Sequence, residues 1–303
     1  MAIRAQPFPT RPIRLIVGSS AGGGGDGVAR VMAAKLTPLL GQQVVVDNRP
    51  GAAGNIATEL VARAPADGYT LLFAYTGHVI NPALFKKLPF DPLRDFSPVG
   101  MIGYNNSALV VNAALPVHSV KELVALARAR PGKLTAGAIP GGSQHLATEM
   151  LKIHAGVDFL YVPYKGNGPA MSDLLAGQLD FMFNSLQLVA PLARAGRLRA
   201  LAVTSEKRSE LMPELPTIGE AAIKGFSAQG WYGLIAPAGT PRNVIVKINE
   251  ALNVILRDTD TQLRFKAMGN EIAASTPEQF DALIRAEIPK WAEVARRAGI
   301  KAE

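Results

Sequence analysis

Gly22, Gly24 and Gly27 give the stretch LIVGSSAGGGGDGVARVMAAKL the G-x-G-x-x-G spacing of a dinucleotide-binding turn. Such a turn joins a strand to a helix, so that a pyrophosphate lies at the helix N-terminus. Asp47 ends the next predicted strand, where an acid that binds a ribose is expected. Asp26 opposes this interpretation because it would place a carboxylate beside the phosphates. An NAD(P)-dependent oxidoreductase therefore stays as an alternative hypothesis.

The same stretch contains the G-x-S-x-G spacing of a hydrolase nucleophile, from Gly18 through Ser20 to Gly22. Such a serine needs an oxyanion donor from an earlier strand–helix loop, and only one strand can precede Ser20. Alternatively, the glycines only permit a tight turn and Asp26 caps the helix. Four consecutive glycines, however, remove every side chain from a surface, which favours close approach of another molecule to the backbone.

A second strand–loop–helix segment, LTAGAIPGGSQHLATEMLKI, occurs in the other half of the chain, with its loop from Gly141 to His145. The N–H groups at a helix N-terminus have no partner within the helix, so they can bind an anion. Two such loops on facing lobes would hold a carboxylate from both sides, directly or through water. The expected donors are the backbone N–H groups of Gly22, Gly23 and Gly142.

The composition argues against several other chemistries. The chain of 303 residues has no cysteine, and its four histidines lack the spacing of a local metal motif, so no metal or cofactor is expected. The net charge of +8 comes from dispersed basic residues, and aromatics are only 6% of the chain, which argues against a nucleic-acid partner. Hydrophobic residues make up 48% without a run of roughly 18 that could span a bilayer, which predicts a globular protein.

Short apolar runs alternate with amphipathic stretches, which predicts βαβ units and parallel sheets. One series fills the first part of the chain, and a second begins near SALVVNAALP. The part after Gly230 is expected to be mostly helical. In its last helix, Thr276 and Gln279 form a predicted capping box, Pro277 suits the first helical position and Gly299 suits the end.

The two series predict an α/β fold with two lobes and a ligand cleft between them. This pattern, taken together with the family resemblance that follows, predicts a first lobe of residues 1–103 and 230–303 and a second lobe of residues 104–229. Ligand binding would then close the lobes. Trp231, at the second crossing, should respond to closure in its fluorescence, whereas Trp291 on the last helix should hardly respond.

Six segments, taken together and in this order, resemble the substrate-binding proteins of tripartite tricarboxylate transporters, the Bug or TctC group of periplasmic solute-binding proteins. The resemblance runs from Phe8 to Ile300. The segments are RPIRLIVGSSAGGGGDGVAR, GQQVVVDNRPGAAGNIATELVARAPADGYTLL, HLATEMLKIHAGVDFLYVPYKGNGPAMSDLLAGQLDFMF, LRALAVTSEKRSELMPELPTIGEA, WYGLIAPAGTPRNVI and STPEQFDALIRAEIPKWAEV.

The resemblance implies a type II periplasmic binding protein, the Venus flytrap fold. It also implies a function that is not enzymatic: binding of a small organic carboxylate and its delivery to the membrane permease subunits of a tripartite tricarboxylate transporter. A monomer is expected. Residues 1 to 5 have no apolar segment of a signal peptide, so the resemblance further implies a periplasmic protein whose leader is missing from this sequence.

The resemblance and the predicted helix starts select the same candidate residues. They are Ser20, Ala21, Gly22, Gly23 and Asp26 in the first loop, Gly142, Ser143 and His145 in the second, and Thr76, Asn184 and Trp231 elsewhere. Two departures from the family pattern bear on the ligand: Gly25 replaces a frequent Thr or Ser, and Asn184 replaces a frequent Asp.

Each polar or aromatic candidate can also be explained by a purely structural function. Asp26 could order a water or the loop amides, or cap its helix. The corresponding structural interpretations elsewhere are a helix cap for Thr76 and Ser143, an interior histidine for His145, a turn for Asn184, core or hinge packing for Trp231 and Tyr232, and a solvated surface position for Lys165.

Overall fold

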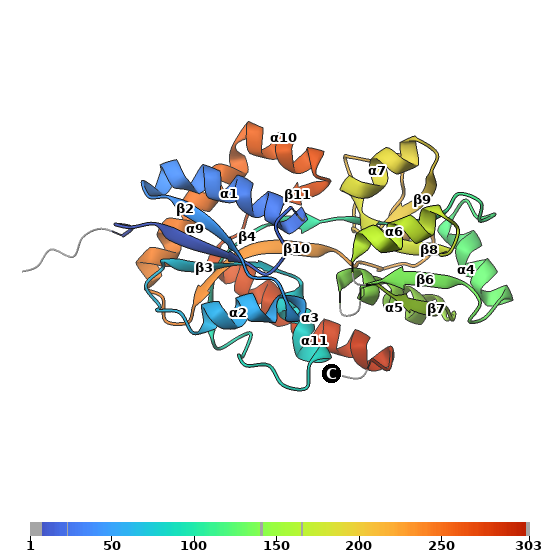
Figure 1. The fold of residues 1–303 in the computed structure, drawn as a ribbon, viewed down its shortest axis with the longest axis horizontal. Helices are drawn as coiled ribbons and strands as arrows, with labels where there is room; N and C mark the ends of the chain where they lie inside the picture. Colours follow the sequence, from blue (N-terminus) through green and yellow to red (C-terminus); the bar gives the residue numbers. More distant parts are fainter. Residues whose placement is uncertain (1–7, 23, 140–141, 165, 301–303) are drawn as a thin grey trace, which may run out of the picture.

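The computed structural model describes residues 8–22, 24–139, 142–164 and 166–300 and contains two β-sheets with helices around each (Figure 1). We call each sheet with its helices a lobe. The first lobe has the strand order β11 (Asn270–Ile272), β4 (Phe96–Asn105), β10 (Gly230–Pro237), β3 (Thr70–Tyr75), β1 (Ile13–Val17) and β2 (Val44–Asn48). The second has the order β7 (Leu160–Pro163), β6 (Thr135–Ala138), β8 (Phe181–Ser185), β5 (Ser107–Asn112) and β9 (Leu198–Val203).

Helices cover both faces of the first sheet because its strand residues alternate between two apolar cores. In β1, Leu15 shares one core with Met32, whereas Ile16 shares the other with Val61. The helices of the first lobe are α1 (Gly24–Leu40), η1 (Ala52–Gly54), α2 (Asn55–Ala62), α3 (Gly77–Leu84), α9 (Arg242–Arg257), α10 (Thr259–Ala267) and α11 (Pro277–Arg297). Those of the second are α4 (Val120–Ala129), α5 (Ser143–Ala155), α6 (Asn167–Leu175), α7 (Leu186–Arg194) and α8 (Ile218–Ala221).

The predicted parallel pairing occurs in only part of each sheet. β1 is parallel to β2 and β3, and β6 is parallel to β7 and β8. β10 is antiparallel to β3 and β4, β11 is antiparallel to β4, and β5 is antiparallel to β8 and β9. The predicted parallel βαβ units are therefore present, but both sheets are mixed. β5 and β10 enter their sheets from the other lobe without a helical crossover, so antiparallel pairing is open to them.

The chain passes between the lobes at two places that are hydrogen-bonded to each other. β4 ends at Asn105 and β5 begins at Ser107, so Asn106 lies between the sheets. Its side chain accepts a hydrogen bond from Gln229 Nε2 at 2.8 Å and donates one to Glu271 Oε1 at 2.5 Å. Both crossings lie within a few residues of the predicted lobe boundaries after residues 103 and 229, and we propose these boundaries for the two lobes.

The last helix follows its predicted signals. The capping box of Thr276 and Gln279 is confirmed, with Pro277 in the first turn. Gly299 has a φ of +67° directly after the helix, as expected for a helix end. α11 packs against α3 and β4 and also reaches α5 of the second lobe (Figure 1). None of the described helices is both long and apolar enough to cross a membrane.

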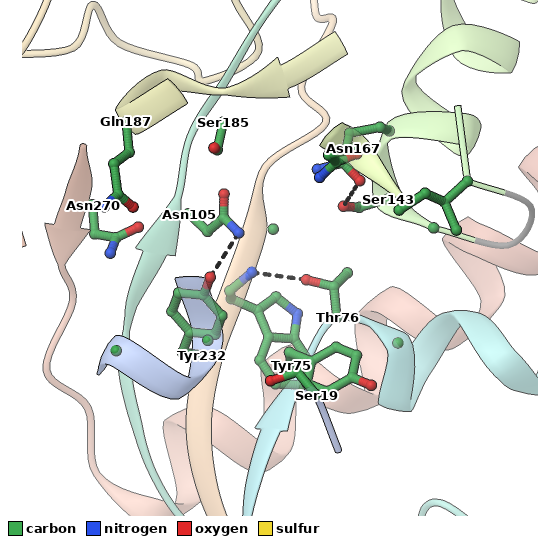
Figure 2. A pocket seen from close by; sticks show the side chains of 18 of the residues that line it. Ser19, Tyr75, Thr76, Asn105, Ser143, Asn167, Ser185, Gln187, Tyr232 and Asn270 are labelled. Atoms are coloured by element: carbon green, nitrogen blue, oxygen red, sulfur yellow. Dashed lines mark hydrogen bonds between the residues drawn. The ribbon is translucent and has the colours of Figure 1, made fainter. Parts of the chain in front are cut away.

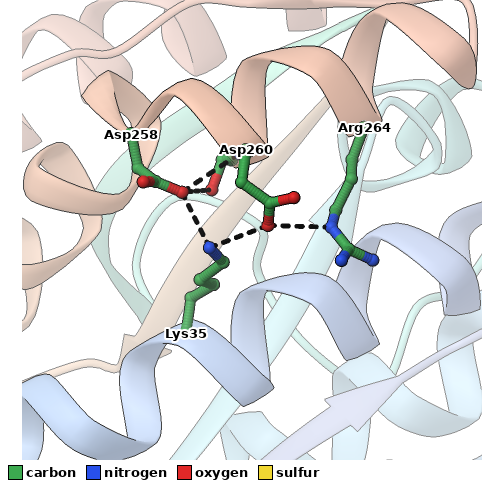
Figure 3. A network of polar contacts seen from close by, with 5 residues as sticks. Lys35, Asp258, Asp260 and Arg264 are labelled. Atoms are coloured by element: carbon green, nitrogen blue, oxygen red, sulfur yellow. Dashed lines mark hydrogen bonds and ion pairs between the residues drawn. The ribbon is translucent and has the colours of Figure 1, made fainter.

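A charged network joins α1 to the start of α10 (Figure 3). Lys35 Nζ lies 2.7 Å from Asp258 Oδ2 and 2.9 Å from Asp260 Oδ2. Asp258 also caps α10 by accepting a hydrogen bond from the backbone N–H of Thr261. Hydrogen bonds from Lys35 hold the pKa of both aspartates below the usual value of 3.8, so both are ionised at neutral pH.

Lys35→Met is expected to lower the melting temperature at pH 7 by about 2 °C, because exposed ion pairs contribute little. A lowered carboxylate pKa stabilises the fold above the unfolded pKa, and this contribution is lost as the pH falls through the folded pKa. The difference between variant and wild type should therefore shrink at pH 3 in differential scanning calorimetry. Lys133→Met, at an exposed position, is the control. A difference that persists unchanged at pH 3 would contradict the electrostatic explanation.

Candidate functional site

A cavity of about 680 Å³ lies between the two lobes and is lined by residues from both (Figure 2). It lies beyond the carboxyl ends of β1 and β3 in the first lobe and of β6, β7 and β8 in the second. Ligands of open α/β sheets bind at this edge, where each strand gives way to a loop.

Five helices of the described part of the chain begin at this cavity. α1 and α3 approach it from the first lobe, and α5, α6 and α7 from the second, each following one of those five strands. Unpaired N–H groups give each helix start a partial positive charge. The lining residues at these helix starts are Gly25 and Gly27 in α1, Thr76 and Gly77 at α3, Gly142, Ser143 and Gln144 at α5, Asn167 in α6, and Ser185, Gln187 and Leu188 at α7.

Neutral hydrogen-bonding groups supply the remaining polarity of the cavity. No described residue that lines the cavity has a charged side chain. No three histidine, aspartate or glutamate side chains gather as a possible metal site anywhere in the described part of the chain. The Ser19 hydroxyl oxygen is buried and has no hydrogen-bond partner among the described residues, so it can serve a ligand. The helix N-termini and the neutral hydrogen-bond donors can therefore attract an anion to the cavity. Among the lining residues that the structure describes, none is a lysine or an arginine.

Asp26 organises the first loop from beneath and is not part of the cavity lining. Its side chain is only 2% exposed. Oδ2 accepts hydrogen bonds from the backbone N–H of Gly22 and from Arg30 Nε, both at 2.9 Å, and Oδ1 accepts one from Asn48 Nδ2 at 2.9 Å. This arrangement matches the interpretation that Asp26 orders loop amides. Gly22 itself lines the cavity as predicted, but its N–H is bonded to Asp26 in this conformation.

In the second loop, as in the first, an N–H group that was expected to bind the ligand is bonded within the protein. The N–H of Gly142 donates to the carbonyl oxygen of Ile139 at 3.0 Å, so it is also engaged within the protein. Ser143 lines the cavity and does not cap the helix, because the N-cap position belongs to Gly142. The Ser143 hydroxyl donates to Gln144 Oε1 at 3.2 Å. Gly23 and Gly141 lie outside the described residues, as does Lys165.

Thr76 lines the cavity at the start of α3 and makes no capping hydrogen bond. Its hydroxyl oxygen accepts a hydrogen bond of 2.7 Å from the backbone N–H of Trp231, which also lines the cavity (Figure 2). The hydroxyl proton is then left to donate to a ligand. Thr76 is therefore both the N-cap residue of α3 and a lining residue of the pocket, although its side chain makes no capping hydrogen bond.

The other candidates lie next to the cavity or behind its wall. Ser20 and Ala21 are exposed on the first loop, and Ser19 lines the cavity in their place. His145 is buried, stacks on Tyr161 with ring centroids 4.3 Å apart, and does not line the cavity. Burial lowers the pKa of His145 to about 4, so it is neutral at pH 7.

Asn184 is fully buried one residue before the lining residue Ser185. Its Oδ1 accepts a hydrogen bond of 2.8 Å from the backbone N–H of Ser185, and Asn184 is absent from the cavity lining. In this conformation it supports the end of β8, which leads directly into α7. Ligand contact by Asn184, Ser20, Ala21 or His145 would require a movement of the wall.

Several lining residues were not among the predicted ones. Tyr75 and Ser185 directly neighbour predicted candidates at strand ends, so the strand-end argument could have included them. Asn105 and Asn270 face each other across the pairing of β4 and β11, and the Asn105 amide donates to the Tyr232 hydroxyl at 2.9 Å (Figure 2). The unpredicted polar lining residues are Ser19, Tyr75, Asn81, Asn105, Gln144, Asn167, Ser185, Gln187 and Asn270.

The acid proposed to bind the ribose of a nucleotide forms ion pairs within the protein. Asp47 lies 2.6 Å from Arg14 NH2 and 2.9 Å from Arg49 Nε, and hydrogen bonds from these arginines hold its pKa below the usual value. Asp26 stands beneath the loop where a pyrophosphate would rest. Asp47, the acid that the dinucleotide hypothesis assigns to a ribose, is therefore paired with two arginines, and Asp26 opposes that hypothesis as the sequence predicts.

Comparison with known proteins identifies relatives along nearly the whole chain. The model of the tripartite tricarboxylate transporter family receptor, TctC, matches residues 28–300. BugT of Bordetella pertussis is 38% identical over 99% of this chain and 93% of its own length.

Three solved structures are similar in fold and sequence. R. palustris Rpa4515 with adipate has a TM-score of 0.88 and 37% identity, over 98% of this chain and 100% of the other. The periplasmic binding protein BugD has a TM-score of 0.85 and 36% identity over the same shares. MatC (Rpa3494) from Rhodopseudomonas palustris with bound malate has a TM-score of 0.82 and 31% identity, over 95% and 99%. These likenesses confirm the predicted fold of a two-lobe periplasmic binding protein.

Proposed function

The chain belongs to the tripartite tricarboxylate transporter receptor family, and we propose that it binds a small organic carboxylate between its lobes and delivers it to membrane permease subunits. In this proposal the protein acts in the periplasm as a monomer and carries out no chemistry on its ligand.

The observation that carries the proposal is the convergence of five helix starts on one cavity between the lobes. Helix N-termini stabilise anions through their partial positive charge. Hydroxyl and amide side chains such as Ser19, Thr76 and Asn167 add donors of hydrogen bonds. A carboxylate can therefore be bound without a lysine or arginine, and released without breaking a buried ion pair.

The ligands named for two of the solved relatives indicate which class of carboxylate to test first. Rpa4515 is described with adipate and MatC with malate, and both of these compounds are dicarboxylates. A cavity of about 680 Å³ is large enough for either. We therefore infer that an aliphatic dicarboxylate is a suitable first probe for this chain.

Thermal unfolding with adipate, malate and adipamide tests the proposal. A ligand at about 100 times its dissociation constant stabilises the native state by about 2.7 kcal/mol, which raises the melting temperature by several degrees. We expect such a rise with at least one dicarboxylate and none with adipamide, which lacks the charge. NAD is a further control and should give no rise. A rise with NAD, or no rise with any carboxylate in an extended series of aliphatic and aromatic acids, would contradict the proposal.

A further inference from the structure

A buried carboxylate on α11 lies behind the cavity wall and is not used by the proposed binding of a ligand. Glu287 is 9% exposed. Its Oε2 accepts a hydrogen bond of 2.7 Å from the indole N–H of Trp231 and one of 3.3 Å from that of Trp291. A single oxygen atom thus holds two tryptophans, one on β10 and one on α11.

The hydrogen bond from Trp231 fixes its indole in one orientation. An indole has only one hydrogen-bond donor, so a single acceptor at this position determines how the ring is held. Trp231 is 1% exposed and packs edge-on against Phe280, with ring centroids 5.2 Å apart. Without the carboxylate, the indole N–H would be buried without a partner, which favours a shift of the residue.

A shift of Trp231 would reach the ligand cavity directly. Trp231 lines the cavity, and its backbone N–H holds the hydroxyl of Thr76 at 2.7 Å. The contacts therefore form a chain from Glu287 through Trp231 to a hydroxyl group at the start of α3. Glu287 itself is not among the lining residues, so it has no direct contact with a ligand.

The charge of Glu287 has its own partner. Lys290 Nζ lies 3.6 Å from Glu287 Oε1 and 4.9 Å from the centroid of the Trp291 ring. The carboxylate thus uses one oxygen for the indoles and the other for a cation. The two functions can be separated by mutation.

We propose that Glu287 is a positioning residue of the ligand site, which holds Trp231 and through it the Thr76 hydroxyl in the geometry that binds a carboxylate. The inference rests on the proposed function. It also changes the expectation for Trp291: this residue shares its carboxylate with Trp231 and belongs to the helix that reaches α5, so it is not remote from the site.

Calorimetric titration of Glu287→Leu and Glu287→Gln with adipate and malate tests the inference. Glu287→Leu should bind about tenfold more weakly than wild type, because it removes the acceptor. Glu287→Gln keeps an amide oxygen in the same place and should bind within about twofold of wild type. Lys290→Met removes the cation but keeps the acceptor, and should also bind within about twofold. Circular dichroism and melting curves establish that each variant is folded.

Tryptophan fluorescence of the unliganded proteins gives a second readout. The emission of Glu287→Leu should differ from that of wild type, and the emission of Glu287→Gln should resemble it. Trp231→Phe provides an independent route if Glu287→Leu does not fold, because it removes the donor instead of the acceptor. It should weaken binding about as much as Glu287→Leu, and the double variant should bind no more weakly than either single variant.

The outcomes separate the inference from the proposed function. A folded Glu287→Leu that binds like wild type would overturn the positioning function of Glu287. So would a Glu287→Gln that binds as weakly as Glu287→Leu, because the charge and not the hydrogen bond would then matter. If Glu287→Leu does not fold, normal binding by Trp231→Phe would overturn it. Wild-type protein that binds no carboxylate would instead refute the proposed function, and the inference with it.

Discussion

Asp26→Leu is expected to weaken carboxylate binding about 100-fold and to lower the free energy of unfolding by about 3 kcal/mol. Asp26 is 2% exposed, and its two oxygens accept hydrogen bonds from Gly22, Arg30 and Asn48. Leucine would leave these three donors without their acceptor. The first loop, which carries the start of α1, would lose the contact that holds it against the strands. Calorimetric titration and urea denaturation measure the two effects.

Asp26→Asn is the matched control, because one amide oxygen can still accept from part of the donor set. It should lie between wild type and Asp26→Leu in both measurements. Burial alone would raise the pKa of Asp26, but the hydrogen bonds from Arg30, Gly22 and Asn48 together lower it below 3.8. Its contribution to stability is therefore present above that pH and is lost as the pH falls through the folded pKa. Asp26→Leu with the affinity of wild type would show that the loop is organised without Asp26.

The two lobes could be predicted because each contains strand–helix units whose apolar periodicity is local. β1, β3 and β8 are short apolar segments, and the next element after each of them is a helix. β11 could not be found in this way. β11 has only three residues. It forms because a segment far along the chain pairs with the edge of β4. Long-range pairing of this kind leaves no periodic signal in the sequence.

The cavity was partly predictable for the same reason. Thr76, Ser143 and Trp231 line it because strand ends and crossings can be recognised locally. Asn105 and Asn270 line it because the register of β11 on β4 sets them opposite each other. That register depends on packing between distant segments, so neither asparagine has a local signal. Whether a residue such as Ser20 contacts a ligand stays a prediction.

Hydrogen-bond partners were the least predictable feature. The glycine-rich loop indicated free N–H groups, yet those of Gly22 and Gly142 are bonded to Asp26 and to Ile139. Spacing shows where N–H groups will gather but not which acceptors the folded chain brings to them. For the same reason the contact of Glu287 with Trp231 could not be predicted, because the two residues lie 56 positions apart in the sequence.

Gly54→Ala is expected to lower the free energy of unfolding by about 3 kcal/mol. Gly54 has a φ of +87°, which costs an L-residue about 1 kcal/mol, and an added Cβ would overlap the hydroxyl of Tyr75, which costs about 2 kcal/mol more. Burial raises the pKa of that hydroxyl to about 12, so it is protonated and donates to the carbonyl oxygen of Ala53 at 3.2 Å. Tyr75 and Ala53 both line the cavity, so displacement of the ring should also weaken carboxylate binding about tenfold.

Gly156→Ala separates the two contributions to this loss. Gly156 ends α5 with a φ of +59°, and an added Cβ would meet no atom within 4 Å, so it should show only the backbone cost of about 1 kcal/mol. Tyr75→Phe removes the overlapping hydroxyl, although the ring carbon Cζ, 2.9 Å from the added Cβ, remains. The double variant Gly54→Ala/Tyr75→Phe should therefore recover part of the stability lost in Gly54→Ala. Urea denaturation of wild type, Gly54→Ala, Tyr75→Phe and the double variant measures this coupling. If Gly54→Ala proved no more costly than Gly156→Ala, Tyr75 would not pack against Gly54 as described, and the hydroxyl would not hold this side of the cavity.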